Sequence, residues 1–311
     1  MKTHPKYALT VAAVFAVAGP AWGGVRATFQ YPLADSVGKM SFGWSPLTWD
    51  ATASELYVVD GSNGVVDVFN DNGMIIYTFG DSAAFGRVAG VAVLPGGEPL
   101  VLGSGTDGYQ LVRCNFRGEP VGKIEPRDVP KAFAEGFRPD SIAVAQDRIY
   151  LADQNAMKVL LLALDGSYQN SFELSRMIGI PEGKAADEMM RGFSVDRDGN
   201  MLFTVATLFQ AYVLSPEGAV RAFGQKGSLP GRFNIAGGIA ADDDGHLFVT
   251  DTLRCVVMVF DRESFRFLGE FGNRGSGPGN LISPLGIAVG NGRVYVTQSV
   301  GTVQAFGVQF E

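Results

Sequence analysis

The stretch Pro284 to Gln298 reads P-L-G-I-A-V-G-N-G-R-V-Y-V-T-Q, and two other parts of the chain follow the same plan. Pro139 to Asp153 reads P-D-S-I-A-V-A-Q-D-R-I-Y-L-A-D, and Pro46 to Asp60 reads P-L-T-W-D-A-T-A-S-E-L-Y-V-V-D. Three more copies carry one extra residue in the turn, and they run from Val88 to Gly103, from Met190 to Val205 and from Ala236 to Asp251. The chain therefore holds six copies of one unit, which start 42 to 51 residues apart.

Each copy contains two short apolar stretches joined by a turn, as in Gly286 to Val289 and Leu247 to Thr250. A third apolar stretch follows, such as Val256 to Phe260, and a fourth ends in Phe-Gly in three copies. Short strands and turns that repeat every 40 to 50 residues or so are typical of propeller blades. The pattern predicts an all-β, six-bladed β-propeller of four-stranded blades, with the small residues of each first strand lining a central channel.

The two ends of the repeat array do not match. The last copy stops at Glu311 without a fourth strand, whereas Val25 to Tyr31 reads as a strand that precedes the first copy. An open array would leave strand edges unpaired. We therefore expect this segment to complete the last blade and to close the ring.

Residues 1–23 resemble a secretory leader. Lys2 and Lys6 precede an apolar run from Ala8 to Ala18, which is too short to span a bilayer, and small residues follow it. We expect cleavage after Gly23, a propeller over residues 24–311, and a periplasmic or secreted protein. No later segment is long and apolar enough to predict a membrane span in the mature chain.

Composition narrows the classes of partner. The formal net charge is −7 and no long basic run occurs, so nucleic acid is not expected as a partner. The two cysteines, Cys114 and Cys255, fall in the second and fifth units, which face each other across a six-membered ring. A disulfide needs Cα atoms within about 7 Å, so none is predicted between them.

The repeat resembles the NHL family, named for the pattern P-x-G-I-A-V-D…G-x-L-Y-V-A-D…R-V-x-V-F. The best copies are Ala236 to Phe260 and Pro284 to Val303, and Phe271 to Gly279 resembles the connector between NHL blades. The resemblance implies a six-bladed propeller that serves as an interaction platform. Some six-bladed relatives are instead metal-dependent lactonases or lyases. The amidating-lyase relatives hold metal with several histidines, whereas only His246 follows the leader here.

Three motifs have simpler structural explanations. Gly103 to Gly108 matches G-x-G-x-x-G, but a strand rather than a helix is expected to follow it, so we interpret it as a turn. Asp242 to Gly245 and Asp196 to Gly199 resemble calcium loops, but the glutamate that an EF-hand needs is absent from both. We interpret these two as hairpin turns.

The last position of the second strand is acidic in alternate copies. From the first copy to the last it holds Asp60, Gly103, Asp153, Val205, Asp251 and Gln298. One interpretation is that each aspartate caps the turn that follows by accepting backbone N–H bonds. The alternative is a ring of carboxylates that attracts a cation or a basic partner.

Two long connections, residues 125–138 and 174–190, are expected on that same face, where propellers commonly bind ligands. They lead into Arg138, Asp140 and Arg191, and the last two stand where other copies carry Leu, Ala or Gly. These residues are predicted to bind a ligand at the channel mouth, with an Asp140–Arg191 salt bridge as the alternative. Trp49 replaces the usual Ile of the first strand, either as core or as a stacking platform.

These observations predict a non-catalytic binding or scaffold module that engages a protein, a peptide or a small ligand of the cell envelope. Its predicted binding residues are Arg138, Asp140, Arg191, Asp60, Asp153, Asp251, Gln298 and Trp49. No cofactor is predicted. The alternative function is a propeller hydrolase or lyase of the lactonase type that depends on a single divalent ion. A purely structural scaffold is a third interpretation.

Overall fold

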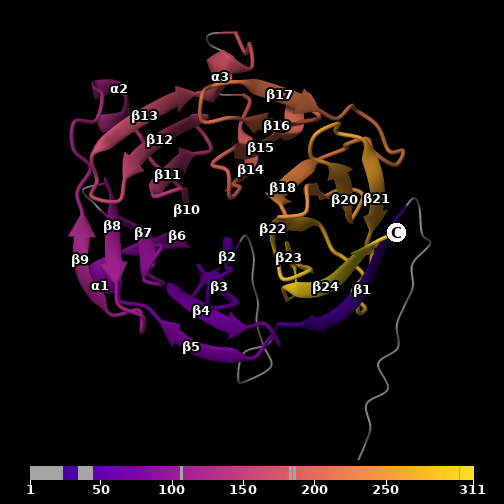
Figure 1. The fold of residues 1–311 in the computed structure, drawn as a ribbon, viewed down its shortest axis with the longest axis horizontal. Coiled ribbons are helices and arrows are strands. Elements are labelled where there is room, and N and C mark those ends of the chain that lie inside the picture. The colour runs from indigo at the N-terminus through magenta and orange to yellow at the C-terminus, as the bar shows by residue number, and fades with distance from the viewer. Residues whose placement is uncertain (1–23, 34–44, 106–107, 182–183, 185–186, 301) are drawn as a thin grey trace, which may run out of the picture.

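The computed structural model of the chain describes residues 24–33, 45–105, 108–181, 184, 187–300 and 302–311. Within them, six four-stranded antiparallel sheets lie in a ring, which confirms the predicted six-bladed β-propeller (Figure 1). The predicted leader and its cleavage site lie outside the described residues. We number the blades 1 to 6 in chain order and letter the strands a to d from the channel outward.

The first three blades each follow the chain order from a to d. Blade 1 contains β2 (Leu47–Asp50), β3 (Glu55–Asp60), β4 (Val65–Asn70) and β5 (Ile75–Phe79). Blade 2 contains β6 (Arg87–Val93), β7 (Pro99–Gly105), β8 (Gly108–Cys114) and β9 (Pro120–Ile124). Blade 3 contains β10 (Ser141–Ala145), β11 (Arg148–Asp153), β12 (Lys158–Ala163) and β13 (Tyr168–Glu173).

Blades 4 and 5 repeat this order, and the sixth takes its outer strand from the other end of the chain. Blade 4 contains β14 (Met190–Val195), β15 (Met201–Val205), β16 (Gln210–Leu214) and β17 (Val220–Phe223). Blade 5 contains β18 (Ala236–Ala241), β19 (His246–Asp251), β20 (Val256–Asp261) and β21 (Phe267–Phe271). Blade 6 contains β22 (Pro284–Gly290), β23 (Arg293–Gln298), β24 (Gln304–Phe310) and β1 (Val25–Pro32).

The ring closes as the sequence predicts. β1 pairs antiparallel with β24, with Val25 opposite Phe310 and Phe29 opposite Phe306. Beyond the strand ends, the N–H of Glu311 donates to the carbonyl of Gly24 at 2.7 Å. Blade 6 therefore has the fourth strand that its own repeat copy lacks.

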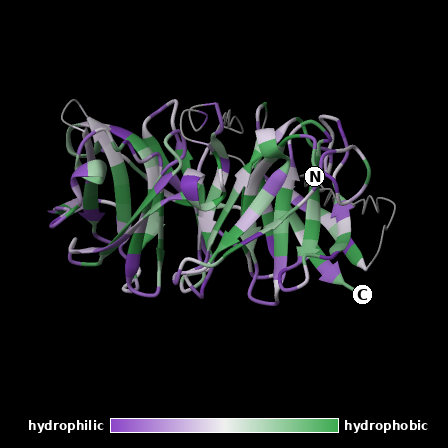
Figure 2. Ribbon diagram, turned by 90° about the horizontal axis from the view of Figure 1, so that it is seen from above, coloured by the Kyte–Doolittle hydropathy of each residue, from purple (hydrophilic) through white to green (hydrophobic). Residues whose placement is uncertain are grey.

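The strands are apolar on both sides because each blade packs between two others. On β19, Leu247 and Val249 belong to the core that blade 5 shares with blade 4, whereas Phe248 belongs to the core shared with blade 6. All three side chains are buried. Figure 2 shows the result, with hydrophobic strands in the body of the ring and hydrophilic segments on its two faces.

Glycines on the inner strands allow neighbouring blades to approach closely. A Cβ at Gly192 of β14 would lie 2.5 Å from the carbonyl oxygen of Gly237 on β18. A Cβ at Gly238 would likewise lie 2.6 Å from the carbonyl oxygen of Leu285. Real Cβ atoms do not come this close to backbone atoms, so the spacing of blades 4, 5 and 6 at the channel requires residues without side chains.

The alternating strand directions sort the connections onto two faces. The b–c turns and the d–a connections share one face, which we call the loop face, and the a–b and c–d turns share the other, the turn face. The connections hold four short helices, which are α1 (Ser82–Phe85), α2 (Lys131–Ala134), α3 (Leu174–Met177) and the 3₁₀ helix η1 (Ala206–Leu208). No helix among the described residues is long and apolar enough to cross a membrane. Cys114 and Cys255 are both buried and free.

Candidate functional site

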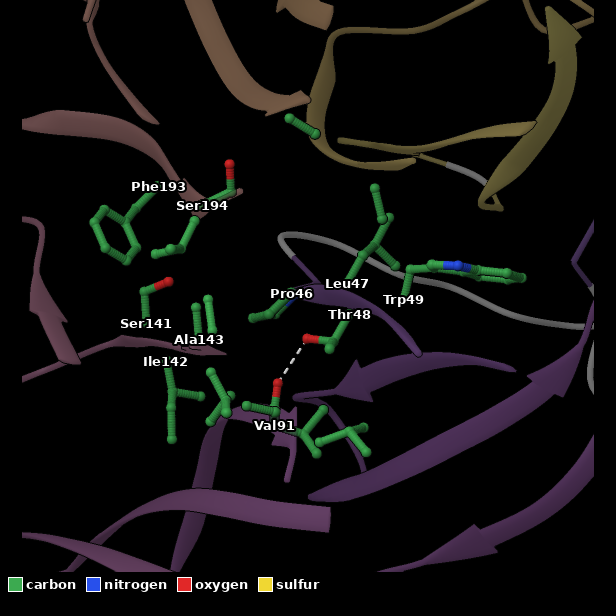
Figure 3. Close-up of a pocket in the computed structure, with 18 of the residues that line it drawn as sticks. Pro46, Leu47, Thr48, Trp49, Val91, Ser141, Ile142, Ala143, Phe193 and Ser194 are labelled. Atoms are coloured by element: carbon green, nitrogen blue, oxygen red, sulfur yellow. Dashed lines mark hydrogen bonds between the residues drawn. The ribbon is translucent and has the colours of Figure 1, made fainter. Parts of the chain in front are cut away.

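A cavity of about 490 Å³ occupies the centre of the ring. Strand a of every blade contributes to its wall, as the small residues of these strands predict. Figure 3 shows Pro46, Ser141, Ala143 and Phe193 around it. The cavity extends from the beginning of the a strands, at the loop face, to their ends at the turn face.

The loop-face end of the cavity brings together Asp140, Gln154 and Arg191. Asp140 precedes β10 and Arg191 lies on β14, so the two occupy corresponding places in adjacent blades 3 and 4. Gln154 follows β11 directly, in the b–c turn of blade 3. We call these three residues the mouth site.

Arg191 is an exposed cation without a partner among the described residues. The pairing of β14 with β15 shifts between Met190 and Gly192, so Arg191 is the extra residue of a β-bulge and has no counterpart across the ladder. Its side chain makes no hydrogen bond or ion pair with any residue that the structure describes. In particular, the alternative Asp140–Arg191 salt bridge does not form. The guanidinium is therefore available to a ligand.

Asp140 is bonded to its neighbour Gln154 instead. The backbone N–H and the side-chain amide of Gln154 both donate to Asp140 Oδ1, at 3.3 and 3.2 Å. Burial raises the pKa of Asp140, against the lowering effect of these bonds. The Gln154 Oε1 atom is buried and has no partner. A ligand that brings an N–H or O–H group to this acceptor would relieve the cost of leaving it unsatisfied.

Gln154 was not among the predicted site residues, although the sequence carries a signal for it. The residue after the repeat position that holds Asp153 is small in every other blade, being Gly61, Ser104, Ala206, Thr252 and Ser299. The long amide side chain of Gln154 departs from this pattern, just as Asp140 and Arg191 replace the Leu, Ala or Gly of the other copies. All three residues line the loop-face end of the cavity.

Arg138 lies on the connection that leads into the mouth site. Its backbone N–H donates to Asp153 Oδ2 at 2.8 Å. Its side chain is exposed and has no partner among the described residues. It is thus a second cation on the same face, outside the cavity wall.

The aspartates that end strand b act as backbone caps. Asp153 accepts from the N–H groups of Arg138 and Ala156, which ties the incoming connection to the b–c turn. Gln298 plays the same part in blade 6, since it accepts from the Ile282 N–H at 2.7 Å and donates to the Thr302 carbonyl. This is the capping arrangement that their position at a turn predicts.

Burial differs among the members of this repeat position. Asp153, Asp251 and Gln298 are all buried, with 3%, 0% and 4% of their surfaces exposed. Asp60 is half-buried and bonds only within its own turn, to the N–H groups of Ser62 and Asn63. The carboxylates point into loops rather than toward one shared ion. The described residues contain no group of three or more His, Cys, Asp or Glu placed to hold a metal.

Trp49 packs between blades 1 and 6. Its ring stacks on Tyr295, with centroids 5.6 Å apart and planes 20° apart. A Cβ at Gly290 would lie 2.0 Å from the indole nitrogen, so the ring fills the space above that glycine. Figure 3 shows Trp49 directed away from Ser141 and Ala143 on the far side of the cavity. This position matches the interpretation of Trp49 as a core residue rather than as a stacking platform for a ligand.

His246 lies outside the cavity wall. Its Nδ1 atom is 2.7 Å from Asp242 Oδ2, and its ring stacks on Phe310 with centroids 3.6 Å apart. Both contacts belong to the turn face. The residues that line the cavity in the described part of the chain include no His, Cys or Lys.

Comparisons with known proteins show the fold and nothing finer. No family model matches the chain, and no curated protein matches it. A streptogramin B lyase structure shares 13% identity and a TM-score of 0.59, over 94% of this chain and 100% of that one. Virginiamycin B lyase from Staphylococcus aureus shares 12% identity and a TM-score of 0.57, over 92% of this chain and 88% of that one. A protein of unknown function from Bacteroides thetaiotaomicron shares 13% identity and a TM-score of 0.63, over 93% of this chain and 76% of that one.

Proposed function

We propose that this propeller is a non-catalytic binding module whose ligand enters the loop-face mouth of the channel and presents a negatively charged group to Arg191. The observation that carries the proposal is the exposed Arg191 guanidinium, which has no partner among the described residues. Arginine binds carboxylates and phosphates with two parallel hydrogen bonds, and it remains charged at any physiological pH.

The surroundings of Arg191 favour such a ligand. Asp140, the nearest carboxyl group of the mouth site, is engaged with Gln154, and burial raises its pKa. Gln154, which lines the same end of the cavity, adds a buried acceptor, Oε1, that has no hydrogen-bond partner. A ligand that carries an anionic group next to a hydrogen-bond donor would satisfy both partners at once.

Binding rather than catalysis is supported by the chemistry of the cavity wall. Its hydroxyl groups include Thr48 and Ser194, which donate to the carbonyls of Val91 and Ile239 in the next blade. Hydroxyls committed to carbonyls, without an adjacent base, are not activated nucleophiles. These bonds join neighbouring blades.

The competing function is a hydrolase or lyase that depends on one divalent ion. Two of the solved structures that share the fold are lyases, but identities of 12% and 13% extend only to the fold. The carboxylates that sequence analysis offered as ligands accept backbone N–H bonds instead. Metal content of the purified protein, with its melting temperature before and after chelation, separates the two functions. A stoichiometric ion whose removal lowers the melting temperature would favour the enzyme.

We infer a place of action in the periplasm or outside the cell. This inference rests on the predicted leader over residues 1–23. Fractionation of cells that express the full chain, with the mass of the recovered protein, tests it. A recovered protein that retains residues 1–23 in the cytoplasm would contradict it.

The test of the proposed site uses small carboxylates of known structure. Titration calorimetry with N-acetyl-glutamic acid α-amide and its neutral analogue N-acetyl-glutamine amide should show tighter binding of the former. Arg191→Ala should abolish the difference, whereas Arg117→Ala, an exposed arginine on the turn face, should leave it unchanged. Equal binding of both compounds by the unchanged protein would refute the site and favour the structural-scaffold interpretation.

A further inference from the structure

Apolar side chains are exposed on one side of the loop face. Leu229, Ile235, Leu253 and Val300 are 64%, 39%, 51% and 63% exposed. They belong to the connection into blade 5 and to the b–c turns of blades 5 and 6. We call these four residues the apolar rim. The b–c turns of blades 1 and 3 instead expose small or polar residues. Apolar side chains gathered on one sector of a face mark interaction sites.

Buried hydrogen bonds hold the central part of the rim in place. The Asp251 carboxylate accepts the N–H groups of both Ile235 and Leu253, at 3.4 and 3.1 Å. The N–H of Thr252 donates to the Ile235 carbonyl at 2.9 Å. Two segments of the rim are thus tied to one fully buried carboxylate. A surface that is ordered in advance loses less conformational entropy on binding.

Ile235 of the rim lies near Arg191 of the mouth site, because their strands are adjacent at the channel. β14 and β18 touch at the channel, where a Cβ at Gly192 would meet the carbonyl oxygen of Gly237. Arg191 precedes Gly192 by one residue, and Ile235 precedes Gly237 by two. The backbone at Arg191 and the rim residue Ile235 therefore occupy neighbouring positions on the loop face.

We propose that the loop face binds a protein segment in which a carboxylate stands beside apolar side chains, with the carboxylate on Arg191 and the apolar side chains on the rim. Charge complementarity argues for this occupant, because Arg191 and Arg138 are exposed cations without described partners. An extended peptide also carries backbone N–H groups, which Gln154 Oε1 can accept once its side chain turns this buried, unpaired atom toward the cavity. The proposal rests on the proposed function and specifies its class of ligand.

The experiment compares three peptides by fluorescence anisotropy. The first is acetyl-Leu-Leu-Glu-Leu-Leu-amide, the second has Gln in place of Glu, and the third has Ser in place of every Leu. The first should bind at least tenfold more tightly than each of the others. A fourth peptide, acetyl-Leu-Leu-Leu-Leu with a free terminal carboxylate, shows whether the carboxylate belongs to a side chain or to a chain end.

Variants of the protein test separately which residue binds the carboxylate and which residues bind the apolar side chains of the peptide. Arg191→Gln should remove the preference for Glu over Gln, whereas Leu253→Ser should weaken both Leu peptides at least fivefold and keep that preference. Val121→Ser, at an exposed apolar residue of the outer strand β9, is the matched control and should change neither. Melting temperatures of the three variants confirm that they fold.

The outcomes separate this inference from the proposed function. If Leu253→Ser has no effect, or if the Ser peptide binds as tightly as the Leu peptide, the rim takes no part and the inference is wrong. Small carboxylates that still require Arg191 would then leave the proposed function standing. If no peptide and no small carboxylate distinguishes the unchanged protein from Arg191→Gln, both are wrong.

Discussion

Removal of the Asp251 carboxylate tests the capping interpretation at its most buried position. The side chain is fully buried and accepts four backbone N–H groups. The donors are Asn234, Ile235, Leu253 and Arg254, at 2.7, 3.4, 3.1 and 3.0 Å. Asp251→Ala leaves these groups facing an apolar gap. If the loops relax so that only two stay dry, at about 1–3 kcal/mol each, the protein loses about 4 kcal/mol of stability.

Asp60 provides a matched control at the same position of blade 1. It bonds Ser62 and Asn63 of its own turn and is half-buried, so water can replace the carboxylate. Asp60→Ala should therefore cost about 1 kcal/mol, as for the loss of an exposed cap. Equilibrium unfolding in urea, followed by intrinsic fluorescence, measures both losses from the shift in midpoint at constant slope.

The opposite result would refute this reasoning. Carboxylates held in a ring to attract a cation would repel each other in the free protein, so that removing either one would stabilise it. Equal effects of Asp251→Ala and Asp60→Ala, or a gain in stability from the former, would show that the N–H bonds do not account for the aspartates.

Three further predictions follow from packing and burial. Gly290→Ala would place a Cβ 2.0 Å from the indole nitrogen of Trp49 and should cost about 1–3 kcal/mol by thermal unfolding, whereas Gly61→Ala, with open space around it, should cost less than about 0.5 kcal/mol. Burial raises the pKa of the Cys114 thiol to about 12, so Ellman's reagent should label it only after unfolding, and rapid labelling of the folded protein would contradict this. Burial also raises the pKa of Asp140, so its ionised form costs stability above the folded pKa, and this cost disappears as the pH falls below the unfolded value of about 3.9. Asp140→Asn should therefore raise the melting temperature at pH 7 but not at pH 3, and an equal shift at both values would contradict the assignment.

The architecture was predictable because the strands of each repeat copy appear in the sequence as separate apolar stretches. Apolar stretches such as Val256 to Phe260 correspond to β20 (Val256–Asp261), and Val25 to Tyr31 corresponds to β1 (Val25–Pro32). Strands buried on both sides carry continuous apolar runs that are visible in a single sequence. The mismatch between the two ends of the array was enough to predict the closure.

The site was predictable only in part, because its members meet through the fold. Asp140 and Arg191 could be found as departures from the repeat, but whether the two side chains pair with each other depends on their placement in the fold. Gln154 stands one place after a capping aspartate, where sequence analysis tested no repeat rule. The apolar rim was not predicted, since Leu253 and Val300 lie in the b–c turns of different blades and share a face only through the ring.

The pairing of β1 with β24 sets an order of events in folding. The ion pair between Arg26 and Glu311 joins residues 285 positions apart, and no nearer partner exists for β1 in the strand order. Contacts of such long range form slowly, because the intervening chain must first be confined. β1, the most N-terminal strand of the described residues, is thus the last to be paired, and until then β1 and β24 both expose free edges on which two chains could join. A chaperone that shields β1 during synthesis would protect the ring at its most vulnerable stage.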